Sequence, residues 1–169
     1  MKHIYLVALW SVTFFCYTPL IHAQKKSSSS TKKKLRPNKD GVYTLAEEMP
    51  RFPGCKQMKG SAKEKKRCAD LRLLKFIYKN VKYPSAALEA SQEGMALVRF
   101  TVTKKGKIED IELLRDPGYE LGKEAVRVVG LMTEMKAGWT PGRYRRKSVA
   151  VQYTLPIRFK LSGKEETKT

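Results

Sequence analysis

The sequence predicts an α+β domain in which helices pack on one face of a small antiparallel three-stranded sheet. Residues 149–161 are apolar at every second position, which is the pattern of a strand with one buried face. Residues 96–103 alternate in the same way and lead through a glycine-containing turn to a return strand, residues 108–114. Two further segments, beginning at Asp70 and at Leu121, carry apolar residues at helical spacing.

Proline and glycine residues set the boundaries between these elements. The first helix ends at Tyr83-Pro84, because the residue before a proline disfavours helical geometry. Pro84 then begins a short helix, residues 85–91, since its missing N–H costs nothing at a first helical position. Asp116-Pro117-Gly118 breaks the chain before the second long helix, and a rigid turn at residues 138–142 precedes the last strand. The predicted order is α-α-β-β-α-β, which places the helices on one face of the sheet.

The chain has 169 residues, enough for one domain and a leader, and its formal charge is +19. Such a charge favours anionic partners: nucleic acid, acidic lipid or cell-envelope polymers. Its two histidines, His3 and His22, lie in the N-terminal hydrophobic segment. A mature chain without that segment has no histidine, which excludes His-dependent catalytic triads and His-ligated metal centres. We therefore expect no catalytic residue, no metal site and no cofactor.

The N-terminal segment predicts export. Lys2 precedes an uncharged run from Ile4 to Ile21, and Ala23 followed by Gln24 is typical of a signal-peptidase site, so residues 1–23 are a signal peptide of a periplasmic protein. The alternative is an uncleaved anchor that holds the protein at the inner membrane, facing the periplasm. Eighteen uncharged residues are close to the minimum for a spanning helix, which needs about 20.

Residues 24–41 follow as a basic, flexible linker rich in serine and lysine. The linker is either a solvated spacer or an electrostatic tether to an anionic envelope surface. It has no aromatic residue on which bases could stack, which argues against nucleic acid as a partner.

Cys55 and Cys68 are the only cysteines of the chain once the leader is removed. In an oxidising compartment, two cysteines that close a loop of this length predict a disulfide. The enclosed residues 56–67 are polar and basic, so apolar burial cannot hold them in place. Closing the loop should stabilise the fold by about 3 kcal/mol. This loop and the helix that follows it form an N-terminal extension, residues 42–82.

An ordered set of residues then resembles a known family. Tyr83-Pro84, the hairpin with Gly94 and Gly106, and Trp139-x-Pro141-Gly142 follow one another in the chain, and Tyr153-x-x-Pro156-Ile157-x-Phe159 comes last. Through these motifs residues 83–162 are similar to the C-terminal domain of the TonB family of energy transducers, with residues 163–169 as a polar tail. The extension resembles a subgroup with an extra N-terminal region, through Met49-Pro50-x-Phe52-Pro53-Gly54 and Phe76-Ile77-x-x-Asn80-Val81. The structural motif of the domain comprises Tyr83, Pro84, Gly94, Gly106, Trp139, Pro141, Gly142 and Pro156, the last within Tyr153-x-x-Pro156-Ile157-x-Phe159.

The resemblance implies a function without catalysis. Members of the family bind the TonB box, a short peptide of outer-membrane TonB-dependent receptors, and pass on energy from an inner-membrane energising complex for transport of siderophores, vitamins or glycans. The alternative is a soluble periplasmic scaffold that binds anionic envelope polymers without energy transduction. An enzyme is the weakest reading, because the carboxylates Glu109, Asp110 and Glu112 lie on a hairpin strand and no glycine-rich phosphate loop is present.

The last strand predicts how the peptide docks. Proline is tolerated in a strand where its missing N–H faces away from the ladder, so Pro156 indicates an edge strand. Successive residues of a strand direct their backbone polar groups to opposite sides. We therefore expect a peptide to add as an extra strand at this edge. Ala150, Gln152 and Thr154 face the open edge, Val151 and Tyr153 bond inward, and Val149 completes the partner-binding strand.

Overall fold

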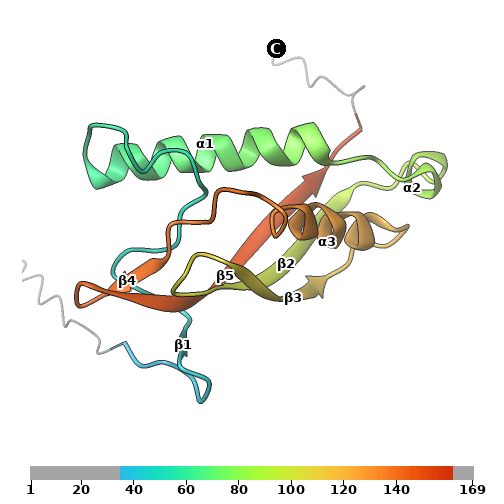
Figure 1. Cartoon of the computed structure of the whole chain (residues 1–169). Helices are drawn as coiled ribbons and strands as arrows, with labels where there is room; N and C mark the ends of the chain where they lie inside the picture. The colour runs from blue at the N-terminus through green and yellow to red at the C-terminus, as the bar shows by residue number, and fades with distance from the viewer. Residues whose placement is uncertain (1–34, 162–169) are drawn as a thin grey trace, which may run out of the picture. The chain divides into compact units, whose positions relative to one another are not determined.

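A computed structural model of the protein describes residues 35–161 (Figure 1). The predicted signal peptide, most of the linker and the polar tail lie outside these residues. No helix in the described part of the chain combines the length and the apolar character needed to cross a membrane. The elements are β1 (Val42–Tyr43), α1 (Ala62–Asn80), α2 (Ser85–Glu89), β2 (Gly94–Val102), β3 (Ile108–Arg115), α3 (Leu121–Leu131), β4 (Gly142–Tyr144) and β5 (Lys147–Phe159).

The sheet has the strand order β1-β5-β2-β3, and β4 pairs with the start of β5. Strand β2 is antiparallel to both β3 and β5, as the sequence predicts, whereas β1 is parallel to β5. The α+β class is therefore confirmed, but the prediction of a three-stranded antiparallel sheet was wrong, because the sheet is mixed and has five strands. Strands of two and three residues are too short to show alternation, which explains why β1 and β4 escaped the prediction.

Helix α1 begins well before Asp70, where the apolar period begins. Ser61 caps it through a reciprocal pair of hydrogen bonds: Ser61 N–H donates to the Glu64 carboxylate (2.7 Å), and Glu64 N–H donates to Ser61 Oγ (3.3 Å). The first turns are polar and project into solvent, so they carry no apolar periodicity. Only the later turns bury side chains, namely Ala69, Leu73 and Ile77.

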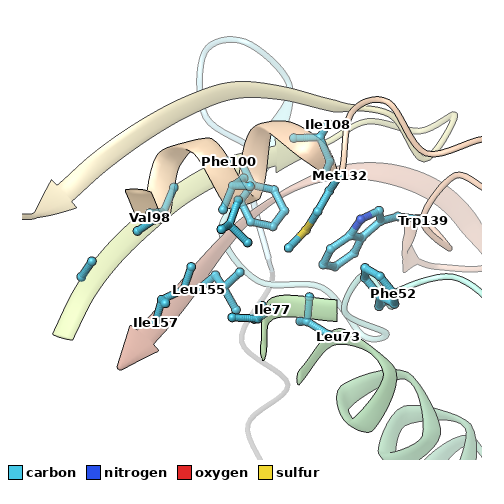
Figure 2. Packing of buried hydrophobic residues seen from close by; sticks show 14 of the residues in the cluster. Phe52, Leu73, Ile77, Val98, Phe100, Ile108, Met132, Trp139, Leu155 and Ile157 are labelled. Carbon is cyan, nitrogen blue, oxygen red and sulfur yellow. The ribbon is translucent and has the colours of Figure 1, made fainter. Parts of the chain in front are cut away.

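The core lies between one face of the sheet and two helices, α1 and α3. Val98 and Phe100 of β2 stand opposite Leu155 and Tyr153 of β5 in the ladder. Figure 2 shows the side chains of the sheet directed toward Leu73 and Ile77 of α1. Both long helices contribute to the same buried cluster, so they lie on the same face of the sheet.

Trp139 joins the hairpin between β2 and β3 to this core. Its ring is buried against Phe52 and Phe100, with centroid distances of 5.6 and 5.4 Å. Its backbone N–H donates to the Gly106 carbonyl (2.9 Å), and Gly106 has a φ of +78°. A Cβ at Gly106 would lie 2.1 Å from the Trp139 carbonyl oxygen. The turn therefore requires glycine both for its backbone conformation and for this close approach.

The other residues of the structural motif also mark close contacts. A Cβ at Gly94 would lie 2.5 Å from Pro117 Cβ, and one at Gly142 would lie 2.3 Å from Val151 Cγ2. The Tyr83 hydroxyl donates to the Gln92 carbonyl (2.5 Å). These residues are therefore packing and turn determinants of the fold, in line with their place in the sequence motif.

Candidate functional site

The candidate site is the side of β5 that faces away from β2, which we call the outer edge. Strand β2 covers the inner side of β5 from Val151 to Phe159. On the outer edge, β1 pairs only with Ala150 and Val151. Within residues 35–161, no strand pairs with the outer edge from Gln152 to Phe159. This part of the strand is left open.

Pro156 determines which residues present hydrogen-bonding groups there. It stands opposite Leu97 in the ladder, and without an N–H it cannot exchange bonds with that residue. The register runs without a shift from Gly94 with Phe159 to Val102 with Val151, so no bulge changes the alternation. By this alternation, Gln152, Thr154 and Arg158 direct their backbone polar groups to the outer edge.

The first part of the outer edge is occupied by the chain itself. The Val42 N–H donates to Asn38 Oδ1, and the Val42 carbonyl accepts from the Asn38 N–H, both at 2.8 Å. The polar groups of Tyr43 are therefore turned to the other side, toward the outward groups of Ala150 and Gln152. The free backbone groups of the outer edge thus begin at the Gln152 carbonyl and continue through Thr154, Pro156 and Arg158.

The side chains of the predicted partner-binding strand divide between the two faces of the sheet. Val149 and Val151 are buried in a small cluster with Ala46, Tyr43, Met49 and Tyr144, so their side chains serve packing. Ala150 and Gln152 are half-buried on the opposite face, and Thr154 is exposed. Of these six residues, only the backbone carbonyl of Gln152 and the backbone and exposed side chain of Thr154 remain free for a partner at the outer edge.

Tyr153 packs in the aromatic cluster rather than presenting a reactive hydroxyl. Its ring stacks on Phe100 (5.5 Å between centroids) and meets Trp139 edge-on (5.4 Å). Burial raises the pKa of Tyr153, the charge of Asp70 raises it further, and Lys66 partly opposes them. The hydroxyl therefore stays protonated at neutral pH, and the two charges that act on it form an ion pair with each other on α1 (2.6 Å).

A groove of about 400 Å³ lies between the segment Glu47–Arg51 and the first turns of α1. Met49, Pro50 and Ala62 give it an apolar lining, and Lys63 and Lys66 contribute positive charge. Met49 also packs against the buried cluster of Ala46, Val149 and Val151, so the groove adjoins the first half of β5. Nothing in the sequence pattern points to this groove, because its walls come from segments without apolar periodicity.

The predicted disulfide joins Cys55 to Cys68, with their Cα atoms 6.1 Å apart. It ties the segment before α1 to the helix, and Phe52 of that segment packs against Phe76 of α1 and against Trp139. The N-terminal extension therefore shares its core with the rest of the domain.

The carboxylates considered for catalysis lie on an exposed strand. Glu109, Asp110 and Glu112 are all exposed, and Glu112 pairs with Arg99 (2.6 Å). Among residues 35–161, no group of three metal-ligating side chains comes together.

The family model of the Gram-negative bacterial TonB protein C-terminal matches residues 79–161. These residues are a TonB C-terminal domain. The matched segment runs from the end of α1 through β5 and contains every residue of the structural motif, so the resemblance seen in the sequence is confirmed. Most of α1 and the disulfide precede it.

Two solved structures resemble the chain, both NMR structures of the Helicobacter pylori TonB C-terminal domain. One is 18% identical, with 63% of this chain and 89% of the other covered and a TM-score of 0.43. The second, a shorter form, is 20% identical, with 56% and 95% covered and a TM-score of 0.40. No curated protein matches the chain.

Proposed function

We propose that this TonB C-terminal domain binds the TonB box of an outer-membrane TonB-dependent receptor as a strand added to the outer edge of β5. The observation that carries the proposal is β1, because the chain's own Val42 and Tyr43 pair in parallel with Ala150 and Val151. The edge therefore already accepts an added strand. Backbone pairing of this kind supplies affinity that depends little on the sequence of the peptide.

The geometry suggests where the peptide lies. A receptor peptide that continues the path of β1 would run parallel to β5, starting where Tyr43 ends. It would bond to the outward groups of Gln152, Thr154 and Arg158. The groove beside Met49 and Lys66 offers room for one of its side chains.

The wider role follows from the family. We infer that the domain acts in the periplasm, exported by the predicted signal peptide or anchored to the inner membrane. It would couple an inner-membrane energising complex to the transport of siderophores, vitamins or glycans through the receptor, without catalysing a reaction itself.

The test is a proline substitution that removes one outward N–H. Thr154→Pro leaves the inner ladder of β5 intact, because the N–H of Thr154 faces the open edge. We expect the variant to fold and to bind peptides copied from the N-terminal segments of the host's TonB-dependent receptors at least about tenfold more weakly, a loss of about 1.4 kcal/mol. Calorimetric titration with a thermal melt measures both properties.

Ser148→Pro is the matched control. By the same alternation its N–H also points outward, but it precedes the segment that β1 occupies, so peptide affinity should not change. Gln152→Pro is a less specific test, because the Gln152 N–H faces Tyr43 of β1 and its loss would also weaken that pairing. Val151→Pro should damage the fold, because Val151 bonds inward to β2. If folded Thr154→Pro keeps full affinity, strand addition at this edge is refuted.

A scaffold that binds anionic envelope polymers is the second candidate, and the charge of +19 favours it. Binding to a polyanion would be insensitive to Thr154→Pro and would be lost at high salt, whereas backbone pairing with a receptor peptide should depend little on salt.

A further inference from the structure

Helix α1 presents a stripe of apolar side chains to solvent. Leu71, Leu74 and Tyr78 are 58%, 47% and 67% exposed, and they are three of the seven large hydrophobic side chains that are exposed among the described residues. At about 100° per residue they lie within about 60° of one another on the helix, on the side opposite Ala69 and Leu73. We call Leu71, Leu74 and Tyr78 the outer stripe.

The helix that carries the outer stripe is strongly basic. It has seven Lys and Arg side chains and two acidic ones. Both acidic groups are already engaged, Glu64 in the N-terminal cap and Asp70 with Lys66. Arg67, Lys75 and Lys79 lie along or beside the outer stripe, and none of them forms an ion pair within residues 35–161.

The position of α1 leaves the outer stripe accessible. Figure 1 shows α1 along one border of the described domain, with its inner side toward the sheet. The buried side chains Ala69, Leu73 and Ile77 face that sheet, so the outer stripe faces away from the protein core. A second copy is an unsuitable occupant, because two chains that each carry a charge of +19 would meet through basic helices.

We propose that the outer stripe docks on the surface of an anionic phospholipid bilayer, with α1 lying parallel to the membrane plane. Leu71, Leu74 and Tyr78 enter the boundary between headgroups and acyl chains, where tyrosine suits the change in polarity. Lys75 and Lys79 extend from one side of the outer stripe toward lipid phosphates, and Arg67 continues the line of contact within it. Both parts are required, since three apolar side chains alone give weak binding.

A fluorophore placed on α1 in the full chain tests this docking. Cys16→Ser removes the one native cysteine outside the disulfide, so that an introduced cysteine is the only free thiol. Leu74→Cys then carries the environment-sensitive dye NBD. The control label is Leu88→Cys on α2, because Leu88 is 50% exposed and α2 has no basic residue. Each labelled chain is added to vesicles of phosphatidylcholine alone or with 30% phosphatidylglycerol, so that any contribution of the N-terminal segment is common to both labels.

We expect the emission of the Leu74 label to shift to shorter wavelength only with the anionic vesicles, and to return in 0.5 M NaCl. The Leu88 label should not respond in either case. The double substitution Lys75→Glu and Lys79→Glu should raise the lipid concentration needed for the Leu74 response by at least about tenfold.

Three outcomes would overturn the proposal. The two labels could respond equally, the response could persist in neutral vesicles or after charge reversal, or the Leu74 label could respond without vesicles as the protein concentration rises. The last result would identify α1 as a contact between copies of the chain.

Discussion

Glu124 holds the end of α1 against α3, and its replacement by glutamine tests how much this contact stabilises the fold. The carboxylate of Glu124 accepts hydrogen bonds from Arg127 Nε and Nη2, both at 2.7 Å, and from the backbone N–H of Lys82 at 2.6 Å. Arg127 also donates to the Asn80 carbonyl (2.7 Å). The side chain of Glu124 is only 11% exposed, so solvent screens these bonds less than at the surface.

Glu124→Gln keeps the shape of the side chain but replaces one carboxylate oxygen with an NH₂ group. That group must face either Arg127 or the Lys82 N–H, both of which are donors, and the ion pair is lost. Hydrogen bonds to charged groups contribute about 1.5–3 kcal/mol each, and glutamine still satisfies part of the set. We expect a loss of about 2 kcal/mol in the free energy of unfolding at pH 7.

The effect should depend on pH in a defined direction. Burial acts to raise the pKa of Glu124, but the bonds from Arg127 and Lys82 outweigh it, so the pKa lies below its ordinary value of 4.5. A lowered pKa means that the native state favours the carboxylate. Its contribution is therefore complete above about pH 4.5 and is lost as the pH falls through the lowered pKa.

Urea unfolding at pH 7 and pH 3 measures this contribution. Glu120→Gln is the matched control, because Glu120, the N-cap residue of α3, pairs with Lys123 at 3.6 Å and is 58% exposed. We expect less than about 0.5 kcal/mol from it at either pH. The reasoning fails if the two variants lose equal stability at pH 7, or if the loss in Glu124→Gln is as large at pH 3.

Three further substitutions probe the framework around the site. Cys55→Ser should lower the free energy of unfolding by about 3 kcal/mol while leaving peptide affinity unchanged, and reduced wild-type protein should match it in urea titrations. Gly106→Ala should lower the free energy of unfolding by at least about 3 kcal/mol, because the new Cβ would collide with the Trp139 carbonyl and because alanine disfavours the positive φ of this residue. A melting temperature near that of the wild type would contradict this close approach. Gly130→Ala, in α3 with open space around its Cβ, should instead stabilise by about 0.5–1 kcal/mol, and a lowered melting temperature would show hidden crowding.

The parts of the fold that the sequence predicted are those set by local patterns. Alternation over thirteen residues identifies β5, and Pro84 marks the start of α2 where the structure places it. The start of α1 could also have been predicted, because Ser61 and Glu64 have the spacing of a capping box. The turns that follow are polar, so apolar periodicity does not reveal this part of the helix.

The candidate site was predictable only in part. The alternation around Pro156 gives the direction of each backbone group, and the uninterrupted register of β2 and β5 leaves that argument intact. Its occupation by β1 was not predictable, because a parallel pair between residues more than a hundred positions apart leaves no local signal. The same applies to the outer stripe: Leu71 and Leu74 belong to the helical apolar spacing that begins at Asp70, and only the packing of α1 shows that they face solvent.

The disulfide also has a mechanical consequence. Tension applied through the linker would first load β1, which two residue pairs and Asn38 hold in place, and then the bridges of Glu48 and Arg51 to residues 143 and 140. Once these yield, residues 35–55 extend to a span of at most about 70 Å. The covalent bond then transmits the pull directly from Cys55 to Cys68, bypassing the basic loop, into a helix whose Leu73 and Ile77 are set in the core. A strained molecule would thus lengthen by a limited amount, uncover the first part of the outer edge of β5, and stop before the pairing of β5 with β2 is disturbed.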